Sequence, residues 1–564
     1  MFRERNPQSS LLQSAFFYPT KKVKLLEKSW AEVFQRKALP LIDEKLFAGM
    51  YCEDNGRPNR EVQIVLGVLL LKDMFNLTDE EALENLEFNL LWHHALRLSL
   101  EEAHLPQKTL HNFRYRLVVH DGGRVAFCET TDRIIAALGI KTGRQRLDST
   151  HIVSNIALLT RLGLFCETIR FFLRSLAKKH PELSGRIPAV LSKRYLKEEG
   201  ESTNYEDTRS DATRRRLGVC ARDLYRLIDK LRGTAAVEME EYHLLERLLR
   251  EQCEIGRKGG GRPAVDDDDA DEGSVPVTLK KPAEVDPSSL QSPHDVEATY
   301  SGHKGKGYEV QVAETCDADN PTQIITQVDL TPSSGSDAAA PESVIETLSE
   351  RDIQPGELYA DTTYGSGRNV IEAEMFGTEL VSPVAGGKCE LTEEDAALRN
   401  FTAADFQIDV LGENRAVCPV GQAAMEEYEE SAAPERVELR FAREICGTCT
   451  LRSRCPVKFD SRLGAYVLEA DLIKVNIERR RRAEASGEFR KRYAIRAGIE
   501  GTNSELKRAH GLGRLRVRGG KRVRLAVYLK ALACNLKRMV RALLEEKSER
   551  PVVAETRMPI PALG

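Results

Sequence analysis

Four residues near the C-terminal end of the chain have types and spacing that suit chemistry on a nucleic acid. In YAIRAGIEGTNSELKRAHG, Tyr493, Arg496, Glu500 and Lys507 lie at offsets of zero, three, seven and fourteen. At roughly 100° per residue of an α-helix, they project within about a 60° arc of one face. A carboxylate flanked by two cations and an aromatic ring suits a site that holds both a divalent metal and a phosphate backbone. The alternative is a solvated helix face joined by ion pairs such as Arg496 with Glu500.

Two aspartates upstream can supply further oxygen ligands. Asp148 lies in GRQRLDSTHIVSNI, which reads as a strand, and Asp361 ends the strand ELYAD before a turn. A carboxylate at a strand end can face a cleft and hold a hard cation, although a single Asp beside a turn is usually a cap. Two Mg²⁺ ions about 3.5–4 Å apart need shared carboxylates, which Asp148, Asp361 and Glu500 together supply. His151, beside Asp148, is more typical of a hydrogen-bonded structural histidine than of a proton shuttle.

Asp148, Asp361 and Glu500 follow one another in the chain, and Tyr493, Arg496 and Lys507 lie around Glu500. This arrangement resembles that of bacterial insertion-sequence DDE transposases, which have a Y-(2)-R-(3)-E-(6)-K signature. The resemblance covers most of the chain. PQKTLHNFRYRL is similar to the N-terminal domain of that family, SPHDVEATYSGHKGKGYEVQVAETCD to its second-strand region, and GLGRLRVRGGKRVRLAVYLKALACNLKRM to its closing helices. The chain departs from the family at Thr363, where Gly or Ala is usual, and this predicts an altered turn after Asp361.

The resemblance implies a transposase that cleaves double-stranded DNA at the ends of an insertion sequence and joins the freed 3′-hydroxyl to target DNA. Asp148, Asp361 and Glu500 would hold two Mg²⁺ or Mn²⁺ ions in a ribonuclease H-like catalytic domain. The DNA would be contacted by Tyr493, Arg496, Lys507, Arg514, Arg516, Arg518, Lys521 and Arg522. A homodimer on DNA is expected, because two DNA ends must be brought together. Two alternatives stay open: an inactive DNA-binding protein derived from a transposase, and a ribonuclease H-like nuclease without strand transfer.

Four cysteines in the C-terminal third could hold a structural metal. They are Cys418, followed by Pro419, and then Cys446, Cys449 and Cys455. One C-x2-C pair with two further thiols satisfies a tetrahedral four-cysteine Zn²⁺ site, although two such pairs would be more specific. Similar cysteine-bearing insertions occur in the transposases that the chain resembles. The alternative is a set of free buried thiols, as expected for the other, scattered cysteines in a reducing compartment.

Charge is unevenly distributed along the chain. The formal net charge is −4, but residues 474–543 carry 21 Lys and Arg against 5 Asp and Glu. Such a basic tract predicts a polyanionic partner. We find no signal peptide, no apolar run near 18 residues and no GxxxxGK[ST] loop. These patterns predict a cytoplasmic, nucleoid-associated protein with no membrane span and no nucleotide cofactor.

The elements that must position these residues can be predicted from periodicity. Residues from about 23 to 138 read as helices, with Thr78 as an N-cap and Pro106 before a basic helix that carries His111, Arg114 and Arg116. This part fits either a helix-turn-helix DNA reader or a scaffold and dimerisation unit. Period-two apolar runs predict strands at GYEVQVAETCD, TQIITQVDL, ELYAD and TELVSPVAG, with a helix between the second and third. That order indicates a mixed sheet covered by helices.

The predicted fold class is an α/β catalytic core, ribonuclease H-like by the resemblance, with an all-α N-terminal domain, a helical insertion and a small Cys-rich insertion. The N-terminal helical domain, for DNA binding or dimerisation, spans 1–140. The catalytic domain spans 141–388 and 472–546, with the helical insertion at 157–256 and a disordered linker at 257–292. The Cys-rich insertion spans 389–471, and a flexible tail 547–564. The acidic run in the linker is more typical of a solvated spacer than of a metal site.

Overall fold

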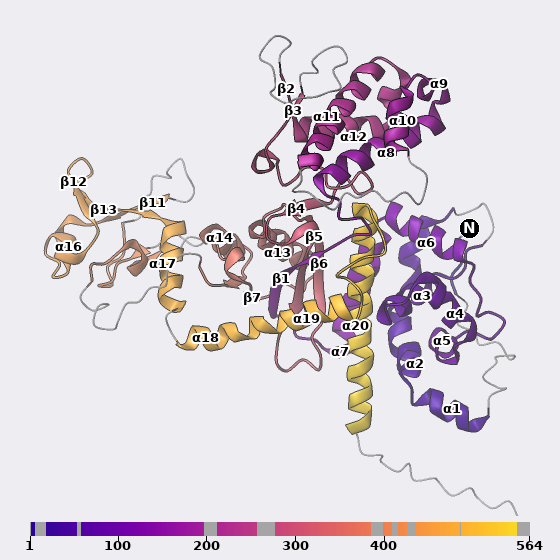
Figure 1. Cartoon of the computed structure of the whole chain (residues 1–564). Helices are drawn as coiled ribbons and strands as arrows, with labels where there is room; N and C mark the ends of the chain where they lie inside the picture. Colours follow the sequence, from indigo (N-terminus) through magenta and orange to yellow (C-terminus); the bar gives the residue numbers. More distant parts are fainter. Residues whose placement is uncertain are drawn as a thin grey trace, which may run out of the picture.

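The computed structural model of the 564-residue chain describes residues 2–5, 19–52, 58–196, 211–256, 277–384, 399–408, 416–425, 436–484 and 487–549. It is a mixed α/β protein with one central mixed sheet among many helices (Figure 1), which confirms the predicted fold class at this level. Among the helices of these residues, none has the length and apolar character needed to cross a membrane.

The central sheet has the strand order β6–β5–β1–β7–β8, and the short β4 also pairs with β5. β5 pairs antiparallel with β1 and β6, whereas β7 runs parallel to β1, and β8 parallel to β7. Nine consecutive residues of β5 are buried, so helices and loops cover both of its faces. The strands are β1 Arg144–Ile152, β4 Thr299–Ser301, β5 Gly305–Thr315, β6 Ile325–Pro332, β7 Glu357–Tyr359 and β8 Glu379–Val381. The four strands expected after residue 308 are confirmed.

The N-terminal helices pack onto the C-terminal helix α20, Gly520–Glu549 (Figure 1). Thr78 begins α4 with the expected cap, here a capping box closed by Glu81, and Pro106 precedes α6. The bounds are α1 Thr20–Glu27, α2 Trp30–Val33, α3 Val62–Met74, α4 Asp79–Phe88, α5 Leu90–Leu96, α6 Gln107–Val119 and α7 Gly122–Leu138. One apolar core includes α3, α7, the sheet and α20, so the boundary predicted at residue 140 does not separate two cores.

A second apolar core belongs to the helices that follow β1. These are α8 Arg161–Lys179, α9 Pro181–Ser184, α10 Ala189–Tyr195, α11 Asp211–Leu231 and α12 Glu240–Gln252. The strand β2, Cys253–Ile255, pairs with β3, Val277–Leu279, and Leu290 is buried in the same core. The predicted linker 257–292 is therefore wrong for residues 277–292, which are ordered by this pairing and burial. Residues 257–276, with the acidic run, lie outside the described residues.

A third apolar core lies in the Cys-rich part, on the opposite side of the sheet from the N-terminal helices (Figure 1). Its elements are β9 Gln407–Ile408, β10 Ala416–Val417, β11 Arg436–Phe441, α16 Arg443–Gly447, β12 Lys458–Asp460 and β13 Ala465–Asp471. β13 leads into α17, Leu472–Glu484, which lies against α14, Gly367–Met375. The helix α13, Ala340–Glu350, lies between β6 and β7 in the chain, as predicted.

The four predicted residues Tyr493, Arg496, Glu500 and Lys507 do not lie on one α-helix. Tyr493 ends α18, Gly487–Tyr493; Ala494–Ala497 form a 3₁₀ turn; and α19 runs over Gly498–Arg508. The prediction of a single helix face is therefore wrong, because the tighter turn changes the angular positions of the residues before α19. At the other end, α20 continues to Glu549, three residues into the predicted tail, and residues 550–564 lie outside the described residues.

Candidate functional site

Asp148 lies within β1, and Asp361 lies two residues beyond the end of the neighbouring parallel strand β7. β1 and β7 pair with Arg146 opposite Tyr359, and each aspartate follows its registered residue by two positions. Because β1 and β7 run parallel in this register, the two aspartates lie at neighbouring positions, and both carboxylates lie near Nη2 of Arg496. The structure therefore brings these two predicted residues together.

Asp361 also caps the turn that follows β7. Its Oδ1 accepts a hydrogen bond from the backbone N–H of Thr363 at 2.8 Å, at the start of the 3₁₀ turn Thr362–Tyr364. Thr363 is exposed, and its φ is not positive. A threonine side chain therefore fits this position without strain, and the departure from the family pattern leaves the cap intact.

Arg496 lies among the three predicted carboxylates. Its Nη2 lies 2.8 Å from Oδ1 of Asp148 and 3.8 Å from Oδ2 of Asp361, while Nη1 donates to Oε1 of Glu500 at 3.0 Å. By the first two distances, the two aspartate oxygens are no more than 6.6 Å apart. The ion pair of Arg496 with Glu500, expected for a plain helix face, is thus present, but the same guanidinium also contacts the strand aspartates.

Asp148 is the most enclosed of the three carboxylates. Its side chain is 14% exposed, against 37% for Asp361 and 68% for Glu500. Burial raises the pKa of Asp148; the charge of Arg496 opposes this shift and that of Asp361 adds to it. Oδ2 of Asp148 accepts a hydrogen bond from Nδ2 of Asn503 at 3.1 Å. Asn503 was not predicted, although its position three residues after Glu500 on α19 could have indicated it.

A buried ionic network docks α19 on the sheet. Glu314 of β5, whose side chain has no exposed surface, lies between Arg146 of β1, at 2.6 Å from Nη2, and Arg538 of α20, at 3.0 Å from Nη1. The hydroxyl of Thr502 on α19 donates to the same carboxylate at 2.7 Å. These contacts join β1, β5, α19 and α20, and so fix the helix that carries Glu500.

Gly498 at the start of α19 is required by this docking. Nη1 of Arg146 donates to the carbonyl of Ile495 at 2.9 Å, directly beneath the turn before α19. A Cβ at position 498 would lie 1.8 Å from that nitrogen. Only a glycine therefore lets the guanidinium pass beneath the helix start.

The carboxylate set fits hard divalent cations, which prefer oxygen ligands. Among the described residues, no three candidate ligand atoms from Asp148, Asp361 and Glu500 lie within 4.8 Å of one another. One ion bound by all three would need a tighter cluster, whereas a pair of ions does not require every carboxylate to meet at one point.

A cationic group lies beside the carboxylates. Nζ of Lys304 lies 3.0 Å from Oε2 of the buried Glu309 and 3.3 Å from Oγ of Ser149. Burial lowers the pKa of Lys507, and the charges of Glu309 and Asp148 oppose this shift. Burial also lowers the pKa of His151, together with the charges of Lys507 and Lys304. Nε2 of His151 is buried and has no hydrogen-bond partner among the described residues, so the structural hydrogen bond expected there is not formed at that nitrogen.

A basic cleft of about 850 Å³ opens between α6 and the loop before α20. The loop is held at the end of β1, where Val153 donates to the carbonyl of Gly513 at 3.0 Å. His111 and Tyr115 of α6 line the other wall, together with Arg114, which is paired with Asp79. All five predicted loop cations line this cleft and are exposed: Arg514, Arg516, Arg518, Lys521 and Arg522. Two basic segments that are about 400 residues apart in the sequence are thus brought together.

Tyr493 is only partly available to a ligand. Its ring stacks on Phe489 at 5.7 Å between centroids, and both rings pack against a small buried group that includes Tyr359. Burial raises the pKa of its hydroxyl. Tyr493 therefore lies next to Arg496 and adds apolar surface to the site near β7.

A further group of candidate ligands, Glu505, His510 and Cys534, lies within 4.8 Å and is the one such group of three or more among the described residues. His510 and Cys534 are fully buried, and Glu505 already pairs with Arg538 at 2.8 Å. A cation there would have to displace this guanidinium from Glu505.

Two family models match the chain. The model described as "Transposase DDE domain" matches residues 417–540, and the model described as "Transposase domain (DUF772)" matches residues 24–116. The first range includes Glu500, the loop cations and the four clustered cysteines, and the second includes α3 to most of α6. Neither range includes Asp148 or Asp361. No curated protein and no solved structure matches the chain.

Proposed function

The chain belongs to the insertion-sequence DDE transposases, and we propose that it cleaves DNA at the ends of an insertion sequence and joins the freed ends to target DNA. The observation that carries this proposal is the convergence of Asp148, Asp361 and Glu500 on the guanidinium of Arg496. Three carboxylates from two strands and a helix, beside a basic cleft, form a site that holds cations and a DNA backbone together.

Asp148, Asp361 and Glu500 would hold two Mg²⁺ or Mn²⁺ ions. Bound ions would activate water or a 3′-hydroxyl for attack on the scissile phosphate and stabilise the charge that develops on it. The residues of the chain orient these ligands: Asn503 holds Oδ2 of Asp148, and the cap at Thr363 holds Oδ1 of Asp361. Arg496 must turn away from the carboxylates as cations enter, because both compete for the same oxygens. Its freed guanidinium would then contact a phosphate near the scissile bond, as would Lys507.

The basic cleft would hold the DNA backbone. Arg514, Arg518, Lys521 and Arg522 make no side-chain hydrogen bond or ion pair with other described residues, so their charges are available to phosphates. Arg516 donates to the carbonyls of Leu77 and Asn76 and so also ties the loop to the N-terminal helices. Because the loop pairs with the end of β1, DNA in the cleft would lie close to Asp148. Such contacts would be independent of sequence and sensitive to salt.

We propose a ribonuclease H-like core for this site. The order β6–β5–β1–β7–β8, with three antiparallel strands followed by two parallel to the first, supports it. The core would consist of residues 141–156, 293–384 and 487–546, with the helices of 161–252 and the Cys-rich part as insertions. The N-terminal helices, which share the core of the sheet, would act as one wall of the DNA cleft. On DNA the protein would act as a homodimer in the cytoplasm, with one copy at each element end.

A cleavage and joining assay tests the proposal. The full chain is incubated with DNA from the flanks of its coding sequence and with Mg²⁺ or Mn²⁺, and nicked and joined products are separated on a gel. We expect both products from the wild type, and neither from Asp148→Ala or Asp361→Ala, while both variants keep DNA binding.

Two outcomes would contradict the proposal. Nicks without joined products would indicate a ribonuclease H-like nuclease that lacks strand transfer. DNA binding by wild type and variants with no cleavage by any of them would indicate a transposase-derived binding protein.

A further inference from the structure

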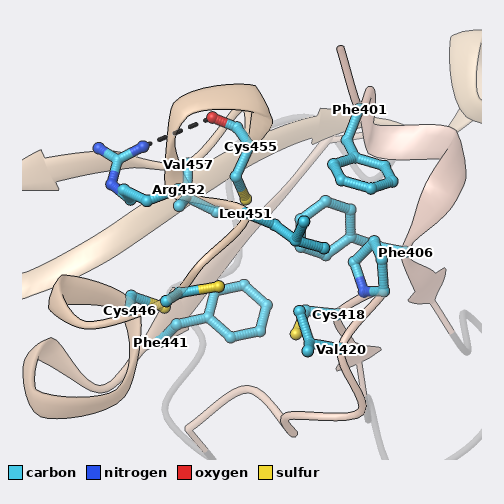
Figure 2. Close-up of a pocket in the computed structure, with 12 residues that line it drawn as sticks. Phe401, Phe406, Cys418, Val420, Phe441, Cys446, Leu451, Arg452, Cys455 and Val457 are labelled. Carbon is cyan, nitrogen blue, oxygen red and sulfur yellow. Dashed lines mark hydrogen bonds between the residues drawn. The ribbon is translucent and has the colours of Figure 1, made fainter. Parts of the chain in front are cut away.

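Four cysteines of the Cys-rich part line one small cavity (Figure 2). The cavity has a volume of about 20 Å³, which is room for about one water-sized particle. The remaining wall is almost wholly apolar and includes the rings of Phe401, Phe406 and Phe441. The thiols are those of Cys418, Cys446, Cys449 and Cys455. Soft sulfur ligands around a space of this size, with partly buried thiols and an apolar lining, suit one thiolate-bound cation.

The backbone turns present the thiols as ligands. Cys418 begins a tight turn in which the N–H of Gly421, at φ +84°, donates to the carbonyl of Cys418 at 2.8 Å. The next N–H, that of Gln422, points at Sγ of Cys418 at 3.4 Å. A backbone N–H aimed at sulfur stabilises a thiolate. Cys446 and Cys449 form the C-x2-C pair at the end of α16, where one short turn carries both.

The four sulfur atoms line one cavity without meeting at one point. No three of the sulfur atoms lie within 4.8 Å of one another. Zn–S bonds of about 2.3 Å place sulfurs about 3.8 Å apart, so a bound ion would draw the four inward.

We propose that Cys418, Cys446, Cys449 and Cys455 bind one structural Zn²⁺. Four protein ligands close the coordination sphere, so the ion takes no part in chemistry. The nearby arginines support a structural role, because their guanidinium groups stack on rings of the same part. These pairs are Arg443 over Phe459, Arg452 over Tyr466 and Arg454 over Phe401. None of its four ligands is a residue that we assign to the proposed DNA chemistry.

The zinc would stabilise a segment whose contacts reach the backbone of Asp361. The Cys-rich part leads into α17, where Arg480 donates to the carbonyl of Gly365 at 3.2 Å and to that of Ser382. The hydroxyl of Ser382 in turn donates to the carbonyl of Asp361 at 2.5 Å. Loss of the ion would therefore loosen a chain of contacts that ends at the backbone of Asp361.

Metal analysis of the full chain, purified under reducing conditions, tests the proposal. We expect about one zinc ion per chain in the wild type and in the control Cys52→Ser, whose thiol is exposed and far from the cavity. We expect loss of zinc in Cys446→Ser/Cys449→Ser. In a second measurement, wild type exchanged into Co²⁺ should show the sulfur-to-cobalt charge-transfer and tetrahedral ligand-field bands of a four-thiolate site. This measurement needs no variant, so it decides the question even where the double variant does not fold.

Two results would overturn the zinc site. One is wild-type protein with less than about a tenth of an ion per chain and no cobalt–thiolate bands. The other is a folded double variant that keeps the full zinc content, which would assign the metal to other ligands.

Discussion

Nη2 of Arg496 lies 2.8 Å from Oδ1 of Asp148, and the same nitrogen lies 3.8 Å from Asp361. The guanidinium thus occupies the space between the carboxylates where cations would bind. It also offsets negative charge at the half-buried Asp148, whose pKa burial already raises. Arg496 therefore has two states in the proposed cycle: bound to carboxylates in the free protein, and bound to a phosphate when ions and DNA are present.

Arg496→Ala should bind Mn²⁺ more tightly than the wild type and cleave DNA more slowly. Hydrogen bonds to a charged group contribute about 1.5–3 kcal/mol, so removal of this competitor should tighten Mn²⁺ binding by about 10- to 100-fold. Titration followed by electron paramagnetic resonance measures the free Mn²⁺, and the gel assay measures cleavage. Arg496→Lys keeps the charge and should show a smaller gain in affinity. Weaker Mn²⁺ binding in Arg496→Ala would mean that Arg496 assembles the carboxylates rather than competing with cations.

Asn503→Ala should reduce cleavage without weakening DNA binding. The amide holds Oδ2 of Asp148 at 3.1 Å and is nearly buried. Loss of groups that orient metal ligands typically costs 10–100-fold in activity or metal affinity. Cleavage rates and fluorescence anisotropy with labelled DNA separate the two effects. The control Asn400→Ala removes an exposed amide away from the site, and equal rates for both variants would contradict a positioning role.

Local patterns in the sequence were sufficient to predict the elements and the strand carboxylates. Asp148 lies on a strand and Asp361 just after one, and the period-two runs of both strands are read directly; Thr78 and Pro106 mark helix starts by their own chemistry. The sequence predicted a mixed sheet, but not which strands pair: the parallel pairing of β1 with β7 is a finding of the structure.

Contacts between distant segments were not predictable in the same way. Glu314 reads as one more residue of a buried strand, and its pairing with Arg146 and Arg538 depends on how three elements pack. The 3₁₀ turn before α19 has the same cause, since Arg146 holds the carbonyl of Ile495. Residue 140 does not separate two apolar cores, because α20 packs on N-terminal helices some 400 residues earlier in the chain.

Glu314→Gln should destabilise the sheet core by about 3 kcal/mol, because it leaves the charge of Arg146 buried without a carboxylate and leaves Arg538 with Glu505 alone. Urea denaturation of the full chain measures the change. Glu346→Gln, at an exposed position of α13, is the matched control and should unfold like the wild type. A shift below about 0.5 kcal/mol in Glu314→Gln would show that the network is not needed to dock α19.

His510 should make the fold sensitive to mild acid. Its Nδ1 contacts the carbonyl of Asp73 at 3.0 Å, and its Nε2 is buried 4.0 Å from Oε1 of Glu505, with no hydrogen-bond partner among the described residues. Burial lowers its pKa to about 4. The unfolded chain binds the proton near pH 6.5, so this stability is complete above that pH and is lost as the pH falls toward 4.

The loss of stability at His510 should reach about 3 kcal/mol at pH 4. His510→Asn keeps a donor toward Asp73 but does not titrate in this range. Urea midpoints measured from pH 7 to pH 4 should therefore fall less steeply in this variant than in the wild type. Parallel curves for the two proteins would show that His510 does not control the acid sensitivity.

The basic cleft should determine the salt dependence of DNA binding. In Arg514→Ala/Arg518→Ala/Lys521→Ala/Arg522→Ala, four exposed cations of the cleft are removed together. Each phosphate contact contributes about −0.9 to the slope of log K against log salt, so the slope should become shallower by about three to four. Fluorescence anisotropy with duplex DNA across a salt series measures it. The control Lys474→Ala/Arg541→Ala removes two cations of the same tract that lie outside the cleft, with side chains 80% and 81% exposed, and should leave the slope unchanged. If both variants changed the slope in proportion to the charge removed, net charge rather than the cleft would account for the affinity.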